Sequence, residues 1–305
     1  MWIWLYGVDN KMKRQILAAI AAVGLSACTF QAAAQSVSVF PAGGRVSMLV
    51  GQGGNVAVSV GEDGTLMVDD QFAYITEDLL MAIDELGGDE PRYVINTHYH
   101  GDHTGGNENL GDGGAAIVAH DNVRKRLQAG ATLAAFNVEM PPKAGTALPS
   151  ITYDSGMTLH INGEAVRLIH VDNAHTDGDT LVYFTGSNVI HMGDTFFNGF
   201  FPFIDTAHGG TLAGMIAAAR LALSLGDDDT VVIPGHGPLS NKTELRAFRD
   251  MLITANARLS KEKAAGRPLL AVLKANPLAD LDAQWGNALF TAERWIQIIY
   301  DRGVF

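Results

Sequence analysis

Only one cysteine occurs among the 305 residues, so the chain can form no disulfide within itself and no metal site built from several thiolates. Basic residues are also few, because 21 Lys and Arg stand against 33 Asp and Glu and give a formal net charge of −12. An acidic chain repels phosphate backbones, which argues against a nucleic-acid partner. Hydrophobic residues make up 47% of the chain, which is enough for a large core and excludes a disordered protein.

Residues 1–34 have the layout of a secretory signal peptide. Lys11, Lys13 and Arg14 form a short basic region, and an apolar stretch over residues 16–24 follows. This stretch is far shorter than the roughly 20 residues that a membrane-spanning helix needs. We therefore expect the protein to be exported to the periplasm.

Two processing sites compete within this export segment. Residues 25–28 (LSAC) resemble a bacterial lipobox, which would make Cys28 a lipid-modified N-terminus and the only link to a membrane. Residues 32–34 (AAA) instead offer the small side chains of an ordinary signal-peptidase site. Met12 competes with Met1 as the true start, because the residues before Met12 fit no part of a signal peptide.

From residue 40 onward, strand and helix patterns alternate without a linker or a repeat, so we expect a single domain over residues 40–305. Short β-rich segments come first, and a helix is predicted over residues 74–86. A region with three prolines, residues 130–153, is predicted to be a long loop. More strands follow, with helices over residues 211–225 and 243–265. Strands in two batches, each followed by helices, predict an α/β fold with two packed sheets and helices outside.

The strongest functional signal is one HYHGDH segment, which directly follows the predicted strand over residues 93–97. It places four side chains that can bind metal within six residues at the edge of a sheet. His98 and His100 alternate, so both can face one side of an extended backbone, while Asp102 and His103 can face a second position. Imidazole and carboxylate ligands without sulfur suit zinc.

Three later residues can supply the ligands that this segment lacks, and each lies at the end of a predicted strand. They are His175, Asp194 and His236, all flanked by glycine or small residues that allow a close approach to an ion. The sequence therefore predicts two zinc ions per chain. The segment FFNGFFPF over residues 196–203 directly follows Asp194, and we expect at least one of its rings to line the site.

The order HxHxDH, then His, Asp and His, resembles the metallo-β-lactamase superfamily over about residues 45–238. The resemblance implies a four-layer αββα sandwich with a dinuclear zinc site at one edge of its two sheets. It assigns His98, His100 and His175 to the first zinc, Asp102, His103 and His236 to the second, and Asp194 to both as a bridge. It also implies that Asp69 is a buried acid that supports the histidine cluster.

Five histidines lie outside this ligand set: His120, His160, His170, His191 and His208. Because His160, His170 and His191 fall inside strand patterns, we expect structural roles for them. His208 follows the phenylalanine-rich segment, and we expect its replacement by alanine to have a mild effect.

The resemblance implies hydrolysis of a small-molecule substrate. Two zinc ions that share a water lower the pKa of that water to near 7, and the resulting hydroxide attacks a carbonyl carbon. Asp102 would orient this hydroxide or carry its proton. The amide bond of β-lactams is the first candidate, because an exported protein meets β-lactams in the periplasm. Thioesters, lactones and other carboxylic esters, as in glyoxalase II-like chemistry, are the alternative.

Two further classes fit less well. Phosphodiester cleavage, as in RNase Z relatives, would use the same ligands but conflicts with export and with the net charge. A non-catalytic zinc-binding protein would not need a complete ligand set for two ions. No feature indicates an obligate protein partner, and the sequence leaves the oligomeric state open.

Several positions depart from particular branches of the family. True metallo-β-lactamases usually have cysteine or serine where this chain has Asp194, which is instead similar to glyoxalase II. Residues 195–198 contain no lysine, the cation that pairs with the β-lactam carboxylate in the cysteine subclass. The segment after Asp194 also lacks the basic residues that glyoxalase II uses for glutathione. We therefore expect a β-lactam to be held mainly by zinc and apolar contacts, with a high KM.

Overall fold

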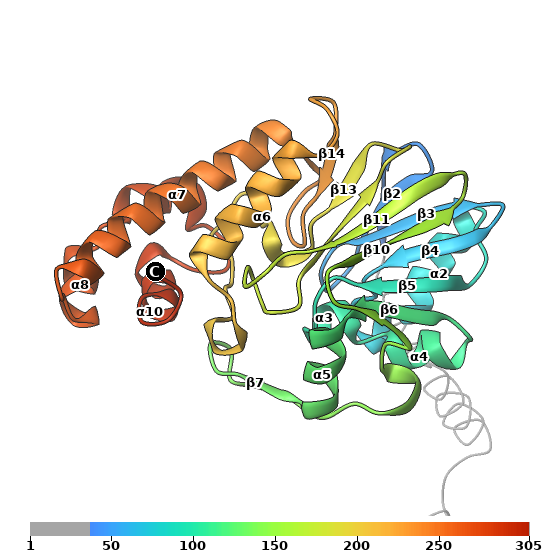
Figure 1. Ribbon diagram of the computed structural model, residues 1–305, viewed down its shortest axis with the longest axis horizontal. Helices are drawn as coiled ribbons and strands as arrows, with labels where there is room; N and C mark the ends of the chain where they lie inside the picture. The colour runs from blue at the N-terminus through green and yellow to red at the C-terminus, as the bar shows by residue number, and fades with distance from the viewer. Residues whose placement is uncertain (1–36, 305) are drawn as a thin grey trace, which may run out of the picture. The chain divides into compact units, whose positions relative to one another are not determined.

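The computed structural model describes residues 37–304 (Figure 1). The expected signal peptide over residues 1–34, with the candidate lipid-modified Cys28 and the alternative start at Met12, lies outside the described residues. Between residues 37 and 304, no helix has both the length and the apolar character needed to cross a membrane.

Seven strands form the first sheet. In spatial order they are β1 (Ser38–Gly43), β2 (Val46–Val50), β3 (Val56–Gly61), β4 (Gly64–Val68), β5 (Pro91–Asn96), β6 (Ala116–His120) and β9 (Ile151–Tyr153). β1 to β4 pair antiparallel, whereas β4, β5, β6 and β9 run parallel. The parallel strands bring their carboxyl ends to one edge of the sheet, which is where the HYHGDH segment begins.

Six strands form the second sheet. In spatial order they are β10 (Gly156–Ile161), β11 (Glu164–His170), β12 (Thr180–Phe184), β13 (Val189–His191), β14 (Val231–Ile233) and β15 (Ser240–Asn241). All neighbours pair antiparallel except β13 and β14, which run parallel. The hairpin between β10 and β11 turns at residues 162–163, as the Asn-Gly pair predicts. His160, His170 and His191 lie in these strands, as expected.

Helices cover the outer faces of both sheets (Figure 1). α2 (Thr76–Glu85) and α4 (Asn107–Asp112) pack on the first sheet, and α6 (Leu212–Ser224) and α7 (Lys242–Ala264) pack on the second. The remaining helices are α3 (Gly101–Thr104), α5 (Asp121–Ala129), α8 (Leu269–Ala275), α9 (Asp282–Trp285) and α10 (Ala292–Ile299). The predicted helices over residues 74–86, 211–225 and 243–265 are thus present with ends shifted by one or two residues.

A third core lies between the two sheets. Leu66 and Ile95 of the first sheet pack there against Leu168, Val182 and Phe184 of the second, and all five side chains are buried. Helix, sheet, sheet and helix therefore form four layers, and the predicted αββα sandwich is confirmed.

Two long helices begin where polar side chains cap their free N–H groups. The Thr211 hydroxyl accepts a hydrogen bond from the backbone of Gly214 at the start of α6. The Asn241 side chain accepts bonds from the backbones of Thr243 and Glu244 at the start of α7. Such caps typically stabilise a protein by about 1 kcal/mol each.

The predicted loop over residues 130–153 differs from the structure. Part of it is a hairpin of β7 (Ala131–Leu133) and β8 (Val138–Met140), and its last residues join the first sheet as β9. Three-residue strands give too few alternations for a period of two to be recognised. The side chains of this hairpin are exposed or half-buried, so no apolar run marks it either.

Asn162 joins the turn of the β10–β11 hairpin to the first sheet. Its amide donates hydrogen bonds to Ser59 O (3.3 Å), Ser59 Oγ (3.2 Å) and Gly64 O (3.0 Å), and its Oδ1 accepts from the backbone of Asp63 (3.2 Å). The residue is 8% exposed and has a φ of 54°, which asparagine tolerates better than most side chains.

We predict that Asn162→Ala lowers the free energy of unfolding by about 2–4 kcal/mol, because it removes several buried hydrogen bonds and places alanine in left-handed backbone. Asn137 is a matched control, since it also has a φ of 54° but is exposed and its side chain makes no hydrogen bond in the described structure. Asn137→Ala should cost only about 1 kcal/mol. Equal losses in denaturant unfolding would show that the Asn162 hydrogen bonds add nothing.

Candidate metal centre

The HYHGDH segment leaves the carboxyl end of β5 and turns into α3. His100 still has extended backbone, with φ −64° and ψ 150°, and α3 begins at the next residue. Asp102 and His103 therefore lie in the first helical turn rather than on the extended stretch. This change of backbone turns the second pair of side chains toward a different position from His98 and His100, as the sequence predicts.

The three later donors come from the second sheet. His175 lies in the loop between β11 and β12, Asp194 follows β13, and His236 follows β14. A Cβ at Gly235 would come within 2.1 Å of Asp194 Oδ1, so only glycine fits beside this carboxylate. A Cβ at Gly54 would come within 2.1 Å of the His103 ring for the same reason. The donors thus meet where the ends of both sheets converge.

The first donor group contains His98, His100, His175 and Asp194, all buried. The Nδ1 atom of His100 lies 3.1 Å from His98 Nε2 and 2.9 Å from His175 Nε2. Asp194 Oδ2 lies 3.4 Å from His175 Nε2 and 3.8 Å from His98 Nε2. Ligands around a tetrahedral zinc ion with bonds of about 2.0–2.1 Å lie about 3.3 Å apart. The group therefore fits the size of such an ion.

The second donor group contains Asp102, His103 and His236, and it shares Asp194 with the first. Asp194 Oδ1 lies 3.1 Å from His103 Nε2 and 3.4 Å from His236 Nε2. Asp102 Oδ2 lies 3.3 Å from His236 Nε2 and 3.7 Å from His103 Nε2. One carboxylate oxygen of Asp194 thus faces each group, which is the geometry of a bridging ligand.

Asp194 Oδ1 also provides an independent test of fit to a cation. This oxygen is buried and accepts no hydrogen bond from any described residue, although His103 and His236 lie within ion-pair distance of it. An ionised carboxylate oxygen without a hydrogen bond is costly to bury, whereas metal coordination would satisfy it. All seven candidate ligands predicted from the sequence are therefore brought together, and they fit two metal ions.

Protein groups behind the donors fix most of the histidine rings. Thr97 Oγ1 lies 3.1 Å from His98 Nδ1, and the carbonyl oxygen of Phe203 lies 2.8 Å from His175 Nδ1. Asp69 is fully buried, and its Oδ2 lies 2.7 Å from His103 Nδ1. Asp69 also accepts hydrogen bonds from the backbone and hydroxyl of Thr97 (2.7 and 2.8 Å). Asp69 therefore supports the cluster as the resemblance implies.

Asp205 holds His100 and was not predicted from the sequence. Its Oδ2 lies 3.2 Å from His100 Nε2, accepts a hydrogen bond of 2.5 Å from the Tyr99 hydroxyl and lies 2.7 Å from His208 Nδ1. Because Nδ1 of His100 faces the donor group, Nε2 must carry the proton and donate a hydrogen bond to Asp205. No local pattern marks Asp205, since its contact with His100 spans 105 residues. His208 lies behind this carboxylate and belongs to neither donor group.

The electrostatics of the metal-free site differ between the two groups. Burial lowers the pKa of His175 to about 4 and holds the pKa of His98 well below its usual range. Burial opposes ionisation of His236 too, but Asp194 and Asp102 outweigh it and raise the pKa of His236 to about 9. Burial raises the pKa of Asp194, but His236, His103 and His175 outweigh it and leave that pKa well below its usual range.

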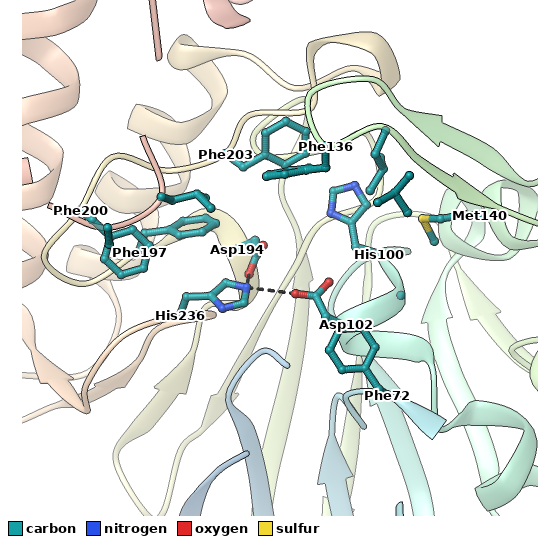
Figure 2. A pocket seen from close by; sticks show the side chains of 15 residues that line it. Phe72, His100, Asp102, Phe136, Met140, Asp194, Phe197, Phe200, Phe203 and His236 are labelled. Carbon is teal, nitrogen blue, oxygen red and sulfur yellow. Dashed lines mark ion pairs between the residues drawn. The ribbon is translucent and has the colours of Figure 1, made fainter. Parts of the chain in front are cut away.

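Both donor groups open onto a cavity of about 690 Å³ (Figure 2). His236 and Asp102, 26% and 29% exposed, lie at its floor, and the side chains around them are mainly apolar. Phe197, Phe200 and Phe203 of the phenylalanine-rich segment line the cavity, as expected. The β7–β8 hairpin supplies further wall residues, among them Phe136, whose ring lies against Phe203. This cavity therefore gives a substrate access to both donor groups.

Comparison with known proteins agrees with this architecture. A family model described as the metallo-beta-lactamase superfamily matches residues 49–236. A hydroxyacylglutathione hydrolase from Polaromonas sp. strain JS666 is 28% identical over 163 residues, which are 52% of this chain and 52% of that protein. The match thus spans about half the length of this curated relative.

Solved structures show the same fold at low sequence identity. A metallo-beta-lactamase from Pontibacter korlensis has a TM-score of 0.57 and 19% identity, with 71% of this chain and 99% of that chain covered. The DIM-1 metallo-beta-lactamase has a TM-score of 0.57 and 19% identity, with 72% of this chain and 98% of that chain covered. Identities this low show a common fold and do not identify the substrate.

We predict that acidification releases metal from the second donor group first. A histidine must lose its proton to bind metal, so a pKa of about 9 makes protons compete at His236 already near neutral pH. His175, with a pKa of about 4, stays neutral until the pH is far lower. Elemental analysis after dialysis at a series of pH values should show one equivalent lost before the other. His236→Ala lacks a ligand of the second ion and should hold only about one equivalent at every pH of the series. Simultaneous release of both ions from the wild-type protein would contradict the assignment.

We also predict that Asp205→Asn weakens metal binding about tenfold, because the carboxylate that fixes and polarises His100 loses its charge. Competition with a chelating dye measures this affinity directly. Asp280 is a matched control, because it pairs with Arg258 away from the donors, and Asp280→Asn should leave the affinity unchanged. Unchanged affinity in Asp205→Asn would mean that His100 needs no acid behind it.

Proposed function

The chain belongs to the metallo-β-lactamase superfamily, and from that premise we propose that it is a hydrolase that uses two zinc ions to add water to the carbonyl carbon of a carboxylic-acid derivative. The observation that carries this proposal is the pair of donor groups that share Asp194 and open together onto one cavity. A single group would bind one ion, whereas two groups this close fit the pairs of ions that activate water in hydrolases.

Zinc ions bound in these groups would supply Lewis acidity at the carbonyl and a water with a pKa near 7. The chain's own residues position and deprotonate that water. Asp102 is suited to the second task, because it lines the cavity and is 29% exposed toward it. Burial opposes its ionisation, but His103 and His236 outweigh burial and hold the pKa of Asp102 at about 2. Asp102 is therefore ionised at neutral pH and can orient the water or accept its proton.

Two classes of substrate compete. The strained amide of a β-lactam is the candidate that expected export favours. A β-lactam carries a carboxylate, however, and none of the lysine or arginine side chains within residues 37–304 lines the cavity. A β-lactam would therefore bind weakly, mainly through the metal ions and apolar contacts.

Carboxylic esters, thioesters and lactones are the second class, and the site supports them better. They need no cation to pair with a carboxylate, and their hydrolysis uses the same donors. Asp194 is similar to the ligand at this position in glyoxalase II. The partly matching relative from Polaromonas is named as a hydroxyacylglutathione hydrolase, and hydroxyacylglutathione is a thioester. We place this class first and retain β-lactams as the alternative. Export to the periplasm, with or without a lipid on Cys28, remains part of the proposal.

We predict that the zinc-loaded protein hydrolyses esters, thioesters or lactones with a higher kcat/KM than nitrocefin or a carbapenem. If it turns over a β-lactam, its KM should be high and nearly independent of salt, since no cation steers the carboxylate. Asp194→Asn should lower kcat/KM at least a hundredfold, because it weakens the ligand shared by both groups. His160 is an exposed histidine outside both groups, so His160→Ala is the control.

A side-by-side turnover screen that includes a phosphodiester distinguishes the alternatives. A micromolar KM for a β-lactam that rises steeply with salt would restore β-lactams to first place and reveal a cation acting on the substrate. No turnover of any carbonyl substrate by protein that holds two metal ions would contradict the hydrolase proposal itself.

A further inference from the structure

Apolar side chains form the walls of the cavity above the donor groups, and its ionisable side chains lie at the floor. Its volume of about 690 Å³ lies within the range of sites that hold drug-sized ligands. The ionisable side chains that line it are all candidate metal ligands, namely His100, Asp102, Asp194 and His236. Its walls contain five phenylalanines, Phe72, Phe136, Phe197, Phe200 and Phe203, together with aliphatic side chains.

The aromatic side chains form two walls that begin at the donors (Figure 2). On one side, the Phe203 ring lies 5.8 Å from His100 and 4.8 Å from Phe136, in an edge-to-face contact with the latter. On the other side, the Phe197 ring stacks on His236 at 5.2 Å and contacts Phe200 at 5.5 Å. An apolar path therefore runs outward from the reacting atoms on both sides.

The mouth of the cavity exposes large apolar side chains to water. Phe136 is 40% exposed, Val138 is 45% exposed and Leu289 is 40% exposed, and all three line the cavity. Adjacent exposed apolar side chains at the rim of a pocket are typical of a ligand-binding surface. A ligand that covered them would gain binding free energy in proportion to the apolar area removed from water.

Charge differs between the floor and the walls of the cavity. At the floor, two metal ions would outweigh the negative charge of Asp102 and Asp194, whereas no lysine or arginine of the described chain lines the walls. A carboxylate carried against the walls, away from the metal ions, would be desolvated without a partner. The part of the substrate that lies against the walls must therefore be uncharged.

We propose that this cavity is an acyl-chain site and that the substrates are uncharged esters, thioesters or lactones with a long or aromatic acyl group. The inference rests on the proposed function, and it adds which part of the substrate the protein recognises. Water adds to the carbonyl carbon, the C–O or C–S bond breaks, and the products are a carboxylic acid and an alcohol or thiol. No oxidant, reductant or further reactant is needed.

The first test is a series of p-nitrophenyl esters from acetyl to octanoyl, measured with the zinc-loaded full chain as the rate that a chelator abolishes. The kcat/KM should rise about two- to fourfold with each methylene, the upper figure corresponding to about 0.8 kcal/mol per buried methylene. The octanoyl analogue with a terminal carboxylate should react at least a hundredfold more slowly. A flat series, or equal rates for the two octanoyl compounds, would overturn the proposal.

Phe136→Asp tests whether the acyl chain of the substrate lies against the aromatic wall. Phe136 is exposed, so the charge should leave the fold intact while reducing the octanoyl-to-acetyl ratio of kcat/KM at least tenfold. Met81→Asp is the matched control, because Met81 is 56% exposed on α2 and does not line the cavity. Its ratio should equal that of the wild-type protein. An unchanged ratio in Phe136→Asp would mean that the acyl chain of the substrate binds elsewhere, and it would overturn the proposal.

A binding experiment separates this inference from the proposed function. The uncharged fluorophore N-phenyl-1-naphthylamine should bind the zinc-loaded full chain with micromolar affinity, be displaced by decanol, and bind at least tenfold more weakly to Phe136→Asp. If no ester is turned over but this binding pattern is observed, the hydrolase proposal fails and the acyl-chain site stands. If esters are turned over but the fluorophore binds both proteins equally or not at all, the hydrolase stands and the acyl-chain site fails.

Discussion

The position of one buried carboxylate, Asp194, constrains the whole functional end of the molecule. Its two oxygens face different donor groups, and one of them accepts no hydrogen bond from the described residues. An ionised carboxylate is stable in such a place only if positive charge surrounds it. Without metal, the protonated rings of His103 and His236 supply part of that charge, and two metal ions would supply it fully. Gly235 leaves the space that this arrangement needs.

The packing between the two sheets sets the distances within the metal centre. His98, His100, Asp102 and His103 extend from the first sheet, whereas the other three donors extend from the second. Their separations therefore depend on the buried contacts between the sheets, such as Leu66 and Ile95 against Val182. Protein interiors are densely packed, so these contacts hold the donors in place. The contacts that stabilise the sandwich therefore also set the geometry of the donor groups.

The floor and the walls of the cavity differ in polarity. The floor holds every ionisable side chain that lines the cavity, and those side chains are the candidate metal ligands. The walls are apolar, with aromatic rings against His100, His175 and His236. Low polarity around the donors would strengthen electrostatic interactions at a reacting carbonyl, and the proposed recognition of the substrate would come from apolar contact.

The sequence alone determined the donor set and the order of the layers. Residue type and spacing identify the HYHGDH segment, and strand ends identify His175, Asp194 and His236, because these are properties of neighbouring residues. The tertiary structure decided which groups orient the donor side chains and which side chains form the cavity walls. Asp205 reaches His100 across 105 residues, and the Phe203 carbonyl that orients His175 is a backbone atom that no residue type reveals. The β7–β8 hairpin, expected as a loop, becomes a cavity wall because Phe136 packs on Phe203, 67 positions away in the chain. Such contacts follow from how the layers pack, and local sequence patterns do not predict them.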